Sequence, residues 1–185
     1  EDTLTDEATR FGAEVTNGVV DSSGKLTARK NFALVTTGFS NTVKALFTWR
    51  QTSGTDVILS AATNGVVYSG TTTLTSRWPS SSVPANVQFA ALGSNSFMAC
   101  AGTVFTAMDE AYAFPSLTGA ASNFTSPNVV IAAYGRVWTA DDAANNNRHT
   151  IWWSNLLDGL TWNSGDSGLL SVREAWPKGQ DTIIA

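Results

Sequence analysis

One short pattern recurs four times along the chain and restricts its fold more than any other feature of the sequence. Each copy begins with Asp or Asn, continues through β-branched and large apolar residues, and ends in small residues; the copies occupy residues 56–61, 86–91, 128–133 and 181–185. A glycine-containing turn and a second apolar run follow each of the first three copies, and the second runs carry Tyr68, Phe97 and Trp138. Such a unit is a small antiparallel meander that cannot bury both of its faces alone, so we expect several units to stack.

The segments between turn residues are typical of β-strands along the whole chain. They are rich in Val, Ile, Thr and aromatic residues, and clusters of Gly, Ser, Asn and Asp separate them. Asn64-Gly65 between two β-branched runs predicts a tight hairpin, and only residues 4–10 and 155–160 are compatible with a helical turn. The sequence therefore predicts an all-β chain, with strands at 32–36, 43–51, 57–62, 66–69, 87–92, 97–100, 104–107, 129–134, 137–140, 150–154 and 169–172.

Meanders stacked around an axis predict β-propeller-type blades, with the small-residue strand innermost and aromatic residues packed between blades. Residues 1–40 are expected to form an N-terminal segment of short strands and turns, and residues 41–185 about three blades plus the start of a fourth. The copies start 30, 42 and 53 residues apart, which predicts insertions in outer loops at 141–148 and 156–168. The prediction is an incomplete propeller within this chain, completed by further chain after the half-finished strand 181–185 or by other chains. A β-sandwich is the alternative.

Composition excludes several classes of protein. Only 14% of the 185 residues are charged and seven are Trp, which excludes disorder and coiled coils, and a single Cys excludes a disulfide framework. The net charge of −4 argues against specific binding of a phosphate backbone. No apolar run approaches the roughly 18 residues that span a bilayer, so we expect no membrane insertion by this chain.

The polar residues form no familiar reactive set. His149 is the only His and lies outside any His-rich metal motif, and Cys100 between two alanines is expected to be a small buried hydrophobic residue. Of the paired carboxylates, Asp109-Glu110 and Asp141-Asp142, we expect both members to point into water. The loop that begins at Asp141 is rich in oxygen atoms that suit calcium, but it lacks the alternating spacing and Gly of an EF-hand. The sequence predicts no catalytic, cofactor-binding or metal-binding residue and no cofactor.

Residues 154–162 resemble the Asp-box turn of sialidase-type propellers. Ser154 stands four residues before Asp158 rather than two, and Gly159 follows the Asp directly. Even a perfect Asp-box is structural, with the Asp capping a hairpin and the Trp packed between strands. The arginine cluster that a sialidase needs is not visible, so we expect no enzyme. The seven Trp could stack on sugars, but packing between blades is the simpler expectation.

Three stretches carry a resemblance to a known family. They contain a Gly-Arg-aromatic hairpin, an aromatic strand ending in Trp-Ser-Asn-Leu, and a Trp-Pro-x-Gly-x-Asp entry into the fourth copy of the pattern, at residues 132–141, 150–159 and 176–185 respectively. Residues 8–17 and 24–30 also match an early segment of that family. On these motifs the chain resembles the tail nozzle proteins of short-tailed bacteriophages, also called tail tubular proteins B, which are usually several times longer.

The resemblance implies a structural virion protein located in the tail. It implies self-association into a ring, usually a hexamer, that docks on a tail adaptor protein, carries tail fibres or a needle and forms part of the channel for DNA ejection. The transiting DNA would pass without specific binding, which suits an acidic chain, and the family has no catalytic residues to carry over. The alternatives are a carbohydrate- or receptor-binding propeller, such as a lectin-like tail adhesin, and a sialidase-like glycoside hydrolase.

Overall fold

The computed structural model describes residues 18–20, 26–28, 41–70, 75–76, 87–100, 104–120, 124–142 and 147–173. The chain divides into two compact units, Glu1–Val35 and Thr36–Ala185. In the first unit, β1 (Gly18–Val20) pairs antiparallel with β2 (Leu26–Ala28). The strand expected at 32–36, the helical turn expected at 4–10 and the fourth copy of the pattern at 181–185 lie outside the described residues.

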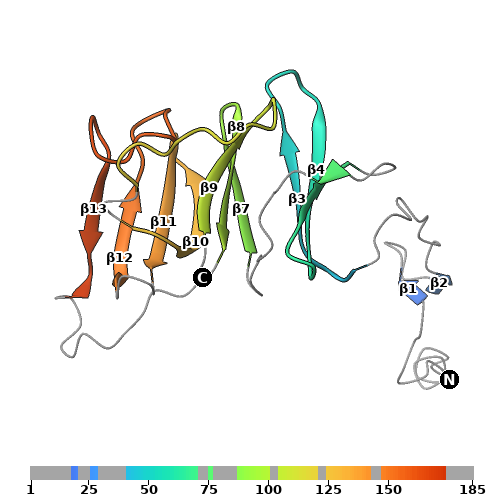
Figure 1. Cartoon of the computed structure of the whole chain (residues 1–185). Coiled ribbons are helices and arrows are strands. Elements are labelled where there is room, and N and C mark those ends of the chain that lie inside the picture. Colours follow the sequence, from blue (N-terminus) through green and yellow to red (C-terminus); the bar gives the residue numbers. More distant parts are fainter. Residues whose placement is uncertain are drawn as a thin grey trace, which may run out of the picture. The chain divides into compact units, whose positions relative to one another are not determined.

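The second unit holds three antiparallel sheets that follow one another along the chain (Figure 1). We call them the first, second and third blade. Each strand predicted within the described residues is present, whereas β1, β2 and β6 have no counterpart among the predicted strands. The prediction of an all-β chain built of propeller-type blades, incomplete within this chain, is confirmed. The first blade consists of β3 (Val43–Arg50), β4 (Asp56–Ala62), β5 (Val67–Ser69) and β6 (Thr75–Ser76), the second of β7 (Val87–Leu92), β8 (Asn95–Cys100) and β9 (Val104–Asp109), and the third of β10 (Pro127–Ala133), β11 (Arg136–Asp142), β12 (Asn147–Trp153) and β13 (Gly168–Ser171).

Tight turns at the predicted glycines join the paired strands. The hairpin at Asn64-Gly65 is confirmed: Gly65 has a φ of 80°, and its N–H donates to the Ala62 carbonyl at 3.1 Å. Asn64 supports the same turn, because its side-chain oxygen accepts from the Val66 N–H at 3.3 Å. The chain reverses here because Gly adopts a left-handed conformation at no steric cost and Asn supplies a local acceptor.

A hydrophobic core lies between the first and second blades. Trp49 and Leu59 of the first blade are fully buried and share this core with Met98 and Met108 of the second. Phe47 also stacks on a ring of the second blade, that of Phe89, with centroids 5.6 Å apart. Burial of each large apolar side chain contributes about 1.5–3 kcal/mol, so this core holds the two sheets face to face.

A second core lies between the second and third blades and is mainly aromatic. Phe97 and Phe105 of the second blade pack with Trp152 of the third, and Phe124 and Trp162 from the connecting segments complete the cluster. The Phe124 and Trp162 rings meet edge to face with centroids 4.9 Å apart. The predicted packing of Trp between blades is therefore confirmed for Trp152 and Trp162.

The second blade is apolar on both faces because it lies between two sheets. Phe89 and Met98 belong to the core shared with the first blade, whereas Ala90 and Phe97 belong to the core shared with the third. This division follows the two-residue alternation of side chains along a strand. A hydrogen bond adds to the contact with the third blade, since Gln88 Oε1 accepts from the Val130 N–H at 3.2 Å.

One prediction about the blades is wrong. The small-residue strand was expected to be innermost in every blade, but in the first blade this strand, β4, is the second in its sheet. The first strand, β3, contacts β7, and β7 in turn contacts β10, so β3 occupies the position expected for β4. The 56–61 copy thus matches the composition of β7 and β10 without matching their place. Small residues in a strand indicate that neighbouring strands lie close to it. This holds for the second strand of a sheet as much as for the first, so small residues alone do not identify the innermost strand.

Candidate docking site

The loop between β12 and β13 begins with a compact turn. Residues 155–160, compatible with a helical turn by sequence, form no helix: Asn155 and Asp158 make an isolated antiparallel bridge, and Leu157 has a φ of 56°. The side-chain oxygen of Asn155 accepts from the backbone N–H groups of Leu156 and Asp166, each at 2.9 Å. A side chain that takes up backbone donors in this way competes with helix formation, and here it fixes both ends of the loop.

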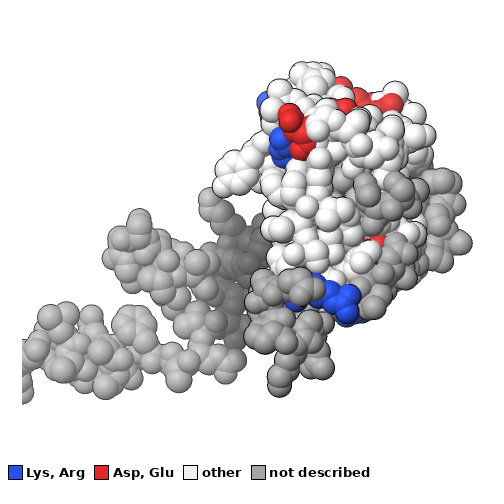
Figure 2. Space-filling model, turned by 90° about the vertical axis from the view of Figure 1, so that its left-hand side faces the viewer, with Lys and Arg blue, Asp and Glu red and all other residues white. Residues whose placement is uncertain are grey.

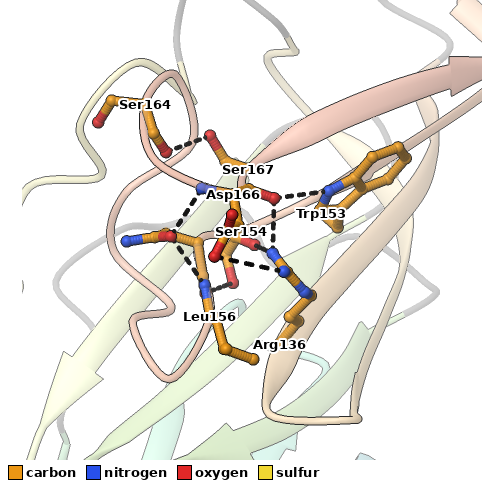
Figure 3. Close-up of polar contacts among 8 residues, drawn as sticks. Arg136, Trp153, Ser154, Leu156, Ser164, Asp166 and Ser167 are labelled. Carbon is orange, nitrogen blue, oxygen red and sulfur yellow. Dashed lines mark hydrogen bonds and ion pairs between the residues drawn. The ribbon is translucent and has the colours of Figure 1, made fainter.

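Arg136 connects this loop to the hairpin between β10 and β11 (Figure 3). Its guanidinium donates to the backbone carbonyls of Ser154 at 2.8 Å and Asp166 at 2.6 Å, and lies 3.9 Å from the Asp166 carboxylate. Trp153 donates from its indole N–H to the same Asp166 carbonyl at 3.0 Å. Both carbonyls accept from the same guanidinium nitrogen, Nη1, and they belong to the start and the end of the loop, so Arg136 holds the two ends of the loop to the hairpin.

The segment that resembles an Asp-box is structural. Asp158 Oδ1 accepts from the Leu160 N–H at 2.9 Å, and the Trp162 indole N–H donates to the Gly159 carbonyl at 3.0 Å. Gly159 lies so close to the aromatic core that an added Cβ would sit 2.3 Å from Phe97 Cζ. The Asp therefore shapes the turn and the Trp anchors it in the core, as a true Asp-box does.

Three large apolar side chains project into solvent from this rigid region, and we call them the apolar tip: Tyr134, Leu156 and Leu157. Tyr134 is 91% exposed and Leu157 79% exposed, the two highest values among the exposed large hydrophobic residues of the described ranges. Tyr134 and Leu157 both have left-handed backbones, with φ values of 54° and 56°. A left-handed non-Gly residue costs about 1–2 kcal/mol, and backbone strain of this kind concentrates at functional sites.

The tip is held by backbone contacts between the two turns. The Leu157 N–H donates to the Gly135 carbonyl at 2.7 Å, and a Cβ on Gly135 would lie 3.0 Å from Leu157 Cδ2. An insertion at 156–168 was predicted from the sequence, whereas the tip itself was not. A usable signal was present, because Tyr134 and the pair Leu156-Leu157 are bulky apolar residues inside turns, where small and polar residues prevail.

The expectation that Asp141 and Asp142 point into water is wrong. They end β11, and Asp142 is 0% exposed: its carboxylate accepts from the backbone N–H groups of Thr125 at 2.9 Å and Ser126 at 3.4 Å. Asp141 is also buried, accepts from the side-chain amide of Asn128 and has Oδ1 4.0 Å from Arg148 Nε. The predicted insertion at 141–148 is thus partly strand, because β11 ends at Asp142 and β12 starts at Asn147.

The other carboxylate pair, Asp109-Glu110, also makes hydrogen bonds that stabilise turns. Asp109 Oδ1 accepts from the Ala113 N–H at 2.8 Å. Glu110 accepts from the backbone N–H of Thr52 and, at 2.8 Å, from its hydroxyl, which links the end of β9 to the turn between β3 and β4.

The remaining candidate residues are spread over the second and third blades. His149 is half-buried in β12, where its carbonyl accepts from the Val172 N–H at 2.8 Å. Cys100 ends β8, and the surroundings of its side chain lie outside the described part of the structure. Trp152 and Trp162 are each 2% exposed and present no ring face to a sugar. Trp78 and Trp176 are not among the described residues.

The side of the molecule that carries the third blade faces the viewer in Figure 2. Most of its described surface is uncharged, and the charged atoms lie mainly towards the upper and lower ends. Within the described ranges, no three His, Cys, Asp or Glu side chains are grouped so that they could hold a metal ion. The same part of the chain contains no helix that is long and apolar enough to cross a membrane. No family model, no curated protein and no solved structure matches this chain.

Proposed function

We propose that this chain is a structural, non-enzymatic component of a bacteriophage tail, one that assembles with copies of itself into a ring in the tail nozzle. The observation that carries the proposal is the apolar tip, in which Tyr134 and Leu157 are held in solvent by strained backbone and a rigid loop. The sequence motifs at 132–141 and 150–159, which resemble tail nozzle proteins, form the hairpin and the strand on which the tip stands.

The tip has the chemistry of an interface anchor. Burial of each side chain against a neighbouring copy contributes about 1.5–3 kcal/mol, and Tyr is favoured at such centres because it is large, rigid and amphipathic. The loop is already fixed by Arg136 and Asn155, so association orders little additional chain. A copy that inserts its tip into a different surface of its neighbour makes a head-to-tail contact, and such contacts close into a ring when the rotation from one copy to the next divides a full turn evenly.

The remaining parts of the proposal follow from the same resemblance. The ring, with six copies as the expected number, would dock on a tail adaptor protein and carry fibres or a needle. Its channel would pass the genome without specific binding, and the net charge of −4 supports this because like charges prevent DNA from adhering to the wall. Four of the described carboxylates, Asp109, Glu110, Asp142 and Asp158, support loops and turns through hydrogen bonds.

Native mass spectrometry tests the ring directly. We expect the full chain to form a closed oligomer and the double variant Tyr134→Ser/Leu157→Ser to remain monomeric, with an unfolding temperature close to that of the unchanged protein because both side chains are exposed. Leu46→Ser is the matched control, since Leu46 is 68% exposed on β3 and should leave the ring intact. A monomeric unchanged chain, or a double variant that assembles normally, would contradict the proposal.

A further inference from the structure

The third blade has a second face that is apolar and open. Val129, Ile131, Trp138 and Ile151 line a groove of about 250 Å³ on the side of β10, β11 and β12 opposite the aromatic core. Ile131 is 53% exposed at this face. An open apolar groove on a sheet, rather than scattered apolar residues, indicates a surface that another element covers.

The equivalent face of the second blade is covered by the sheet that follows it. When the turn between β7 and β8 is matched to the turn between β10 and β11, Ala90 and its partner Phe97 correspond to Ile131 and its partner Trp138. Both Ala90 and Phe97 are buried in the core beneath the third blade, and Phe97 is 0% exposed. The open face of the third blade therefore corresponds, position by position, to a face that the next sheet covers.

We infer that residues 181–185 cover this groove as the first strand of a further blade. Ten residues separate β6 from β7, and ten residues separate β13 from Thr182. Both connections carry a Trp-Pro pair, Trp78-Pro79 in one and Trp176-Pro177 in the other. The chain thus has the length and the sequence pattern to cross from the last strand of the third blade as it does from that of the first.

The placement follows that of β10. In the contact between the second and third blades, β10 lies against β7 and β8. The groove on the third blade lies over the corresponding strands β10 and β11, with β12 at its side. A single strand is therefore enough to fill it.

The side chains of this segment suit the groove in either register. In β10 the third residue of the recurring pattern, Val130, packs towards the preceding blade, whereas in β7 the fourth residue, Phe89, does so. The corresponding residues of the 181–185 copy are Ile183 and Ile184. Because both are isoleucine, a β-branched apolar side chain enters the groove whichever alternation the strand adopts.

The opposite end of the stack is unsuited to the groove, which argues against a second copy docking there. The outer side of β3 carries four exposed residues, of which only Leu46 is apolar; the others are Lys44, Thr48 and Arg50, and Arg50 pairs with Asp56 at 3.1 Å. Covering the groove with that surface would bury charged groups against apolar ones, which costs free energy. The apolar tip is a separate surface, so the filling of the groove does not depend on the proposed ring.

Cross-linking within the full chain tests the inference. Two variants are made, one that combines Ile131→Cys with Ile183→Cys and one that combines it with Ile184→Cys. Both carry Cys100→Ser, which removes the only native thiol. Both also carry Tyr134→Ser/Leu157→Ser, so that ring formation does not affect the result. A short bismaleimide is expected to join one of the two pairs within a single molecule. The matched control, Leu46→Cys with Ile183→Cys, should give no link.

Links formed only between molecules would mean that a second copy covers the groove, and the absence of any link would mean that the face stays bare; either result overturns the inference. Deletion of 174–185 from the otherwise unchanged chain gives a second measurement that needs no cysteine. We expect the deletion to raise the fluorescence of a bound apolar dye severalfold by uncovering Ile131 and Trp138. An unchanged fluorescence would also overturn the inference.

Discussion

Asp142 shows how a residue that looks reactive in a sequence can be wholly structural. Its side chain ends β11 inside the protein and accepts from two backbone N–H groups of the segment that leads into β10. A buried carboxylate is tolerated when it is satisfied in this way, because charge-assisted hydrogen bonds offset part of the cost of leaving water. Asp142 thereby fastens the start of β10 to the end of β11.

Replacing Asp142 by Ala should therefore be costly. The substitution leaves the N–H groups of Thr125 and Ser126 without this acceptor, and we expect the free energy of unfolding to fall by about 2–4 kcal/mol. Urea denaturation measures the change. Asp56→Ala is the matched control: Asp56 forms an exposed pair with Arg50, so its loss should cost less than about 1 kcal/mol, and equal effects of the two variants would refute the structural role of Asp142.

Trp162 is likewise a structural residue, although a Trp could also stack on a sugar. It is 2% exposed and meets Phe105 and Phe124 edge to face, so Trp162→Ala should lower the free energy of unfolding by about 3–5 kcal/mol through loss of packing and formation of a cavity. Leu157→Ala, only a few residues away but 79% exposed, should change it by less than about 0.5 kcal/mol. A small effect of Trp162→Ala would show that the indole is not part of the core.

At the scale of elements, the loop after β12 and the hairpin between β10 and β11 behave as one unit. Arg136 lies on the hairpin and binds two carbonyls of the loop, while Asn155 ties the two ends of the loop together. The apolar tip draws one residue from the hairpin and two from the loop. Its shape consequently depends on these polar contacts more than on the hydrophobic core.

Arg136→Gln should loosen this unit without unfolding the protein. Loss of the two guanidinium hydrogen bonds removes about 1–2 kcal/mol of local stability, so amide hydrogen exchange at Leu157 and Asp166 should accelerate roughly tenfold. Arg50→Gln, at an exposed pair in the first blade, is the control and should leave those two amides unchanged. Unaltered exchange in Arg136→Gln would show that other contacts fix the loop.

Period-two patterns and turn residues were sufficient to predict the elements themselves. Strands such as β10 and β11 stand out because they are rich in Val, Ile and Thr and flank a glycine turn at Gly135, and the hairpin at Asn64-Gly65 is encoded within a few residues. Features that depend on distant partners were mispredicted or missed. The burial of Asp142 requires the backbone of Thr125 and Ser126, which only the fold brings near, and the place of β3 beside β7 depends on packing between sheets.

The position of the candidate site along the chain was predictable, but its backbone conformation was not. The unequal spacing of the repeats located an insertion after β12, whereas the left-handed backbones of Tyr134 and Leu157 arise from contacts between two turns. Local sequence does not encode such contacts. The structural role of Asp158 and Trp162 was visible in advance because the spacing of these two residues, though degenerate, resembles a known turn.

At the scale of the whole second unit, each blade is stabilised mainly by its neighbours. The two cores lie between sheets rather than within one, so a sheet with an uncovered apolar face is incomplete until something packs on it. The inferred strand at 181–185 would cover the groove on the third blade, and the proposed ring would cover the apolar tip. Stacking of sheets and association of copies thus use the same hydrophobic driving force on two different surfaces.

Single-particle imaging of isolated phage tails is the sharpest test of the proposed ring. We expect a closed ring of copies in which Tyr134 and Leu157 of each copy are buried against the next copy. Tails in which this chain forms no ring, or in which both side chains face solvent in every copy, would contradict it.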